Sequence, residues 1–93
     1  NVAFCARDAG RLDAVAAELS AQYGAAVHAA PCDVLDEAAV RAFIAGTCDR
    51  FGGLDILVNN AALMVEITDK PLIQTDRARF DKGLAVNVWG ALN

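Results

Sequence analysis

Three short apolar runs, separated by stretches with helical periodicity, limit the folds open to this chain more than any other feature. The runs cover residues 2–5, 25–30 and 54–58. The third shows no apolar–polar alternation, which is typical of a strand covered on both faces of a parallel sheet. This order predicts βαβ units and an α/β fold with a doubly wound parallel sheet. The helical stripes between the runs are Leu12, Val15, Ala16 and Leu19, and then Val40, Phe43, Ile44, Thr47 and Phe51.

Capping residues predict where the helices begin and end. Asp8 and Asp36 stand where a carboxylate would accept hydrogen bonds from the first turn of each helix. Gly24 and the pair Gly52–Gly53 stand where each helix would stop. After a further loop, Thr75 is the expected N-cap of a last helix that runs to the end of the chain.

Charge and composition exclude several classes of function. The chain has 12 acidic against 8 basic residues, a formal charge of −4, and no basic cluster, so we expect no nucleic acid and no membrane as partner. No apolar run approaches the roughly 20 residues that span a bilayer. Cys5, Cys32 and Cys48 are odd in number and lack C-x-x-C spacing, which predicts reduced thiols in a cytoplasmic protein and no metal site. His28, inside a strand, is expected to be a hydrogen-bonded or solvent-facing histidine and not a ligand.

Polar residues follow each apolar run directly. In open parallel sheets, ligands bind beyond the carboxyl ends of the strands, and these ends share one edge. Three polar turns at one edge therefore predict a ligand site. The turns are Ala6-Arg7-Asp8, Cys32-Asp33-Val34 and Asn59-Asn60-Ala61-Ala62.

The same turns carry a resemblance to a known family. DILVNNAA, residues 55–62, resembles the strand-end NNAG motif of the classical short-chain dehydrogenase/reductases. CDV, residues 32–34, resembles their adenine-contacting D-V pair, and LAVNVWGAL, residues 84–92, resembles their N-V/L-x-G helix segment. The three segments follow the family's order across the whole chain. Ala62 departs from the pattern, because glycine is usual there.

The resemblance implies that residues 1–93 are part of a single NAD(P)-binding Rossmann domain, truncated at both ends. The family's central first strand with its glycine-rich turn, and its Ser and YxxxK motifs, would lie outside the chain. The whole protein would transfer hydride between nicotinamide and a carbonyl or secondary alcohol, as a homo-oligomer (dimer or tetramer). The isolated chain is expected to be inactive and not to fold cooperatively. The alternative is a non-catalytic NAD(P)-binding regulatory protein on the same fold.

Asp33 and Val34 are the expected adenine contacts. The resemblance implies that the carboxylate of Asp33 accepts the exocyclic amine and that the N–H of Val34 meets a ring nitrogen. The alternative for Asp33 is a turn aspartate that caps its own backbone. The resemblance implies that one amide of Asn59 and Asn60 ties neighbouring strand ends together, while the adjoining backbone lines the cofactor ribose. The small Ala61 and Ala62 would let that backbone come close.

Arg7 bears on the choice of cofactor. An acidic residue at the position of Ala6 would bind the ribose hydroxyls of NAD, and here it is absent. The guanidinium of Arg7 suits a phosphate, although Asp8 beside it offsets part of the charge. NADP(H) is therefore favoured over NAD(H).

Asn87 is the one residue of this chain that the resemblance assigns to the catalytic set. At about 100° per residue, it falls in an apolar stripe with Phe80, Leu84 and Ala91, so we expect it to be buried. The resemblance implies a helix perturbed at this asparagine and a carbonyl freed to hold a water, which makes its role positioning. The alternative is an amide that locks a neighbouring loop. Trp89 falls on the opposite face, either in a subunit interface or partly exposed.

Overall fold

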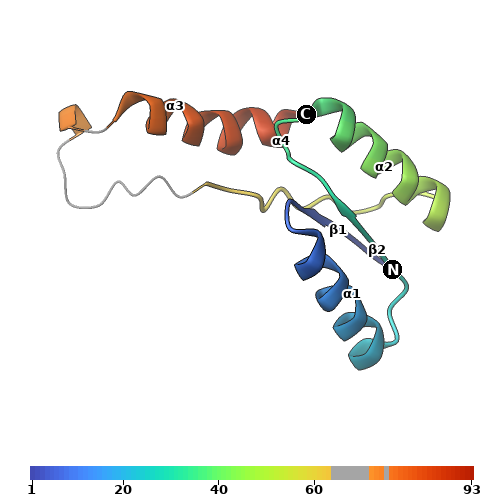
Figure 1. Ribbon diagram of the computed structural model, residues 1–93. Coiled ribbons are helices and arrows are strands. Elements are labelled where there is room, and N and C mark those ends of the chain that lie inside the picture. Colours follow the sequence, from blue (N-terminus) through green and yellow to red (C-terminus); the bar gives the residue numbers. More distant parts are fainter. Residues whose placement is uncertain (64–71, 75) are drawn as a thin grey trace.

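The computed structural model describes residues 1–63, 72–74 and 76–93 (Figure 1). The strand–helix–strand–helix order predicted for the first half of the chain is confirmed. The last predicted helix is also present, but a π-helical segment interrupts it. The elements are β1 (Val2–Ala6), α1 (Ala9–Tyr23), β2 (Val27–Pro31), α2 (Glu37–Phe51), η1 (Leu72–Gln74), α3 (Arg77–Leu84), η2 (Ala85–Trp89) and α4 (Gly90–Leu92).

β1 and β2 form a two-stranded parallel sheet. Val2 pairs with Val27 at one end of the ladder, and Ala6 pairs with Pro31 at the other. α1 and α2 lie on opposite sides of this ribbon (Figure 1), which confirms the predicted α/β arrangement for this part of the sheet. The most buried apolar residue is Leu12 of α1, which is 3% exposed.

The caps of the first two helices are those that the sequence predicted. Asp8 and Asp36 each accept the backbone N–H of the third helical residue, at 3.1 and 3.0 Å. Both helices end on a left-handed residue, Gly24 with φ 62° and Gly52 with φ 83°. Glycine adopts this conformation without the steric cost that a Cβ imposes, so the helix ends follow from local chemistry.

The third helix begins at a different cap from the predicted one. Asp76 Oδ1 accepts the N–H of Ala78 at 3.0 Å, so Asp76 and not Thr75 is the N-cap of α3. Both side chains are good caps, but a carboxylate also complements the positive end of the helix dipole. Thr75 itself lies outside the described residues, as do Met64 and Pro71 in the loop before it.

The third predicted strand is wrong. Residues 54–58 form no strand, and Ile56 and Val58 are 78% and 75% exposed. A cavity of about 250 Å³ beside this run is lined by Asn1 and Ala3, by Thr47 and Phe51 of α2, and by residues 53–56. A strand needs a partner for its N–H and C=O groups, and the described residues supply none here. The central strand implied by the family resemblance stays a prediction.

His28 holds β2 against α2. Its Nδ1 lies 3.1 Å from Thr47 Oγ1, and the hydroxyl of Thr47 donates to the carbonyl of Phe43 at 2.8 Å. Because that proton is already used, Thr47 accepts from His28, and the hydrogen is on Nδ1. The imidazole also stacks on Phe43 at 5.4 Å. Of the two expectations for His28, the hydrogen-bonded one is confirmed.

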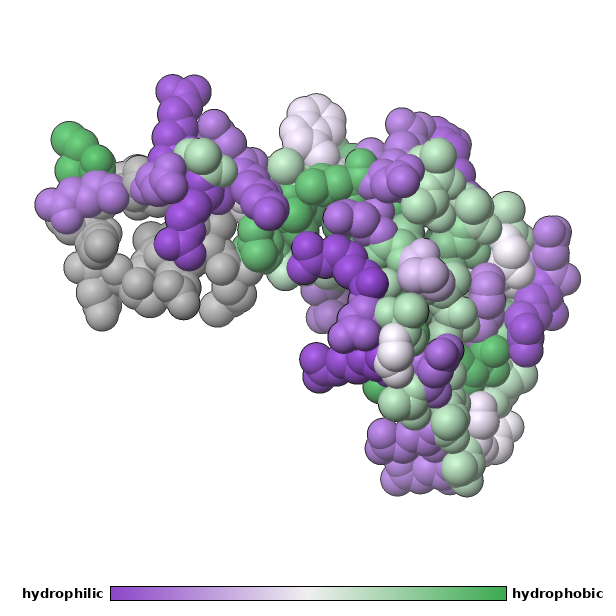
Figure 2. Space-filling view, viewed as in Figure 1, coloured by the Kyte–Doolittle hydropathy of each residue, from purple (hydrophilic) through white to green (hydrophobic). Residues whose placement is uncertain are grey.

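The elements α3, η2 and α4 follow one another directly and form one C-terminal helical run. This run carries an exposed apolar surface, which Figure 2 shows in green over η2 and α4. Trp89 is 63% exposed and Leu92 is 70% exposed. The partly exposed tryptophan is thus confirmed for the single chain, while a subunit interface on this face stays a prediction. Among the described residues, no helix has the length and apolar character needed to cross a bilayer.

Replacing Thr47 by valine should destabilise the full-length protein by about 1–3 kcal/mol, because Nδ1 of His28 would lose its acceptor in the interior. Thr47 is 2% exposed, and valine has nearly the same shape, so the hydroxyl alone is tested. Urea denaturation measures the loss. Thr47→Ser keeps the hydroxyl and is the control; equal losses in both variants would assign the effect to packing.

Candidate functional site

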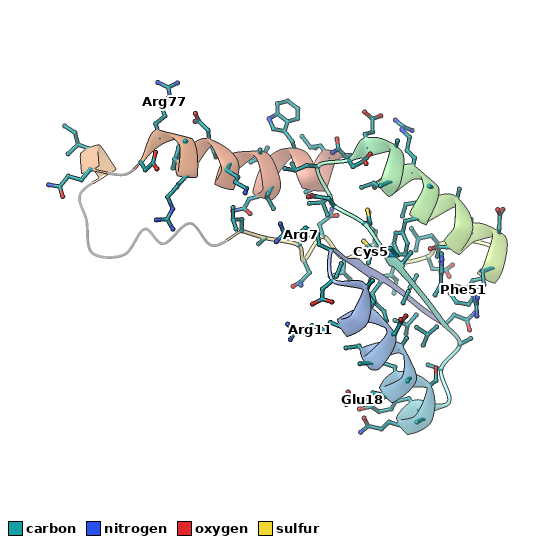
Figure 3. All side chains as sticks on the ribbon, viewed as in Figure 1. Cys5, Arg7, Arg11, Glu18, Phe51 and Arg77 are labelled. Carbon is teal, nitrogen blue, oxygen red and sulfur yellow. The ribbon has the colours of Figure 1, made fainter. Side chains whose placement is uncertain are left out.

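The carboxyl ends of β1 and β2 meet at one edge, as the sequence predicted for its polar turns. The N–H of Cys32 donates to the carbonyl of Ala6 at 3.0 Å, so the ladder continues one residue past β2. This bond draws the turn after β2 next to Arg7, which is exposed at the end of β1 (Figure 3). Two of the three predicted turns are therefore neighbours.

The turn after β2 is built by Asp33. Its Oδ1 accepts the N–H of Leu35 at 3.0 Å, and its carbonyl accepts the N–H of Asp36 at 2.9 Å. The alternative reading of Asp33, a turn aspartate that caps its own backbone, is thus confirmed. The second carboxylate oxygen takes no part in this turn. Within the described residues, the N–H of Val34 donates no hydrogen bond either, so an acceptor and a donor remain open side by side.

The third turn lies in an exposed segment that is neither helix nor strand. Asn59, Asn60, Ala61 and Ala62 are all exposed, and the N–H of Asn60 donates to the carbonyl of Val58 at 3.0 Å. Neither asparagine amide forms a side-chain hydrogen bond in the part of the chain that the structure describes. The side chains after the asparagines are small, so the backbone here is open to a ligand.

Asn87 forms two hydrogen bonds to the backbone at the end of this third turn. Its Oδ1 accepts the N–H of Leu63 at 2.8 Å, and its Nδ2 donates to the carbonyl of Leu63 at 3.1 Å. One side-chain amide therefore satisfies both backbone groups of a single residue, as a neighbouring strand would. The alternative reading of Asn87, an amide that locks a loop, is confirmed.

The expectation that Asn87 is buried is wrong, because it is exposed in this chain. The helix is π-helical over η2, and the N–H of Gly90 donates to the carbonyl of Ala85, five residues back. Such a turn is wider than an α-turn. Leu84 and Ala91 of the same stripe are exposed as well, so the described residues leave most of this face uncovered. The perturbation of the helix at this asparagine was itself expected, and it is present.

The same helical run also contacts the turn after β2. Asn93 Nδ2 donates to the carbonyl of Val34 at 2.8 Å, and Gly90 packs against the side chain of Val34. Thus one helix supports two of the polar turns, through Leu63 on one side and Val34 on the other. Sequence reasoning missed Gly90 and Asn93; the only available signal was the glycine in the NVWG segment.

Cys32, the first residue of this turn, is buried, and its thiol is unreactive at neutral pH. Burial first, and then the neighbouring Cys5 and the carboxylates of Asp36 and Asp33, together raise the pKa of its thiol to about 11. A thiol with such a pKa is protonated at neutral pH and is a poor nucleophile or metal ligand. All three cysteines are free, and the described residues contain no cluster of three metal-binding side chains. Cys32 is buried and Cys5 and Cys48 are partly buried, as expected for packing residues; their reduced state stays a prediction.

The family follows from comparison with known proteins. Residues 1–93 match the model of a family described as enoyl-(acyl carrier protein) reductase. A short chain dehydrogenase/reductase of Macrophomina phaseolina is 36% identical over 90 residues, which are 97% of this chain and 50% of that protein. The chain belongs to the short-chain dehydrogenase/reductases.

Two further relatives show how much of a short-chain dehydrogenase/reductase this chain spans. Sorbitol dehydrogenase of Cereibacter sphaeroides is 40% identical over 73 residues, or 78% of this chain and 27% of that protein. The structure of an alcohol dehydrogenase from Thermococcus sibiricus, complexed with 5-hydroxy-NADP, matches with a TM-score of 0.82 at 32% identity, covering 95% of this chain and 36% of that one. The chain spans between about a fifth and a half of the length of the curated relatives it matches.

Asn87→Ala should raise the hydrogen-exchange rate of the Leu63 amide in the full-length protein by about tenfold, because it removes the acceptor of that N–H. Asn87→Asp keeps the acceptor oxygen but sets its second oxygen against the carbonyl of Leu63, so it should restore only part of the protection. Exchange read by NMR at Leu63, with the amide of Ala61 as an internal reference, measures the difference. Unchanged exchange in the alanine variant would show that Asn87 does not hold this turn.

The raised pKa of Cys32 also predicts a pH dependence of stability. The thiol of an unfolded chain loses its proton near pH 9, whereas the folded thiol keeps it until about pH 11. In that window the unfolded state binds fewer protons, so the free energy of unfolding should fall as pH rises. Urea denaturation of the full-length protein between these pH values checks it. Cys32→Ala should show a shallower fall, and an identical slope would contradict the assignment.

Proposed function

We propose that the full-length protein is an NAD(P)(H)-dependent oxidoreductase that transfers hydride between nicotinamide and a carbonyl or secondary alcohol. The observation that carries this is Asn87: it lies in a π-helical turn and binds Leu63 directly after the exposed Asn59–Ala62 segment. Relatives named dehydrogenases and reductases support the same class. A cytoplasmic homo-oligomer, dimer or tetramer, belongs to this proposal.

The turn at Asp33 offers the hydrogen-bond acceptor and the donor that an adenine requires. A free carboxylate oxygen of Asp33 can accept a hydrogen bond from the exocyclic amine, and the open N–H of Val34 can donate to a ring nitrogen. The two groups lie on adjacent residues of a turn that Oδ1 already fixes. One oxygen shapes the turn while the other serves the ligand, so both readings of Asp33 hold together.

Arg7 supports NADP(H) over NAD(H), with NAD(H) as the second choice. Its guanidinium is exposed at the end of β1, and it precedes Asp8, whose Oδ1 is engaged in capping α1. A planar permanent cation at this position favours a phosphate on the adenosine ribose. The relative from Thermococcus sibiricus was solved with 5-hydroxy-NADP, in agreement with this preference.

The remaining site residues have positional roles. The backbone of Asn59, Asn60, Ala61 and Ala62 would line the cofactor on its ribose side, where the alanines permit close approach. Asn87 would keep this segment in place and offer a carbonyl, loosened by the π-turn, to a water of the proton path. The cofactor supplies hydride chemistry when bound; acid–base residues are expected elsewhere in the full-length protein.

Arg7→Ala should weaken NADPH binding by the full-length protein about ten- to a hundredfold, because a charged hydrogen bond to phosphate is lost. NADH binding should change little, since it has no such phosphate. Fluorescence titration of both cofactors gives the two dissociation constants. Arg50→Ala, in the last turn of α2, is the matched control. Equal weakening for both cofactors would contradict a phosphate contact.

Turnover separates the enzyme from the regulatory alternative. The full-length protein is mixed with NADPH and a panel of aldehydes and ketones, and oxidation of the cofactor is followed by its absorbance. We expect consumption of NADPH with at least one carbonyl compound. Binding of NADPH without turnover across the panel would support a non-catalytic, regulatory protein instead.

A further inference from the structure

Gly90 stands where no side chain fits. A Cβ built on this residue would lie 2.6 Å from Val34 Cγ2 and 3.2 Å from Val34 Cβ. The backbone at Gly90 is ordinary right-handed helix, with φ −60°, so glycine is not needed there for its conformational freedom. Its lack of a side chain is what allows the helix to approach the turn after β2.

Asn93 adds a directional contact at the same place. Its Nδ2 donates to the carbonyl of Val34 at 2.8 Å. Gly90 and Asn93 are three residues apart and therefore lie on one face of the helical run. Together they hold Val34 from its side chain and from its carbonyl, while its N–H stays open among the described residues.

The position of Val34 sets the distance between the two protein groups proposed to bind adenine, which are the free carboxylate oxygen of Asp33 and the N–H of Val34. Asp33 is tied by its Oδ1 to Leu35 and by its carbonyl to Asp36, on either side of Val34. Valine has a stiff χ1 and cannot swing away from an added methyl without cost. A displacement of Val34 would therefore move its N–H relative to the free oxygen of Asp33.

We propose that Gly90 and Asn93 are positioning residues for adenine recognition, which act by docking the helix that carries Asn87 onto the Asp33–Val34 turn. This inference rests on the proposed function. Neither residue need touch the nucleotide. The helical run becomes the common support of the adenine turn and of the turn ending at Leu63.

Gly90→Ala in the full-length protein is the first test. Binding of NADPH and of adenosine 2′,5′-bisphosphate should weaken about tenfold, because the turn is displaced. Binding of nicotinamide mononucleotide, which has no adenine, should not change, nor should kcat at saturating NADPH. Ala91→Ser, at the next and exposed residue, is the matched control and should bind like the parent. The double variant Gly90→Ala/Val34→Ala should recover affinity relative to Gly90→Ala, because the methyl that clashes is gone.

Asn93 provides a second test that leaves the packing intact. Asn93→Leu should weaken adenosine 2′,5′-bisphosphate binding about three- to tenfold. Asn93→Asp should weaken it more, because a carboxylate would face the carbonyl of Val34. If Gly90→Ala does not fold, these two Asn93 variants test the positioning role on their own.

The outcomes distinguish this inference from the function on which it rests. Parent-like adenosine 2′,5′-bisphosphate affinity in Gly90→Ala, or in both Asn93 variants, would overturn the positioning role and leave the proposed function standing. A fall in kcat at saturating NADPH, or equal weakening of nicotinamide mononucleotide, would overturn it as well. A parent protein that binds no dinucleotide would overturn the proposed function and this inference together.

Discussion

The parallel ladder between β1 and β2 is the constraint on which the rest of the site depends. Five residue pairs and the further bond from Cys32 to Ala6 bring two chain segments, more than twenty residues apart in sequence, to one edge. Since parallel strands leave the sheet on the same side, Arg7 and Asp33 become neighbours without any contact of their own. Asp36 then starts α2 immediately, which keeps the turn short.

How far the sequence could predict this structure depends on the range of each interaction. Asp8, Asp36, Gly24 and Gly52 acted as predicted because a cap involves only the nearest turn of chain. The run 54–58 did not, because a strand depends on a partner that its own residues do not specify. The same distinction between local and long-range interactions holds for the site. Its turns were predicted from local motifs. The contacts of Gly90 and Asn93 with Val34 join residues far apart in sequence and left no local pattern.

Asp33 shows why a structural and a functional reading need not compete. A carboxylate has two oxygens and accepts several hydrogen bonds. Using Oδ1 to fix its own turn reduces the freedom of Oδ2, and a ligand that binds an already fixed group loses less entropy on binding. The hydrogen bond that fixes the turn would thus also favour Asp33 as the adenine acceptor proposed above.

The bond between Asn87 and Leu63 has a consequence for sequence variation. Within the described part of the chain, the amide hydrogen-bonds only to the N–H and C=O of residue 63, and every amino acid except proline presents both groups. The two hydrogen bonds of Asn87 therefore do not depend on which side chain stands at residue 63. Residue 63 can change size or polarity while its backbone stays fixed, so related proteins can diverge in what they display there without disturbing the helix that holds it.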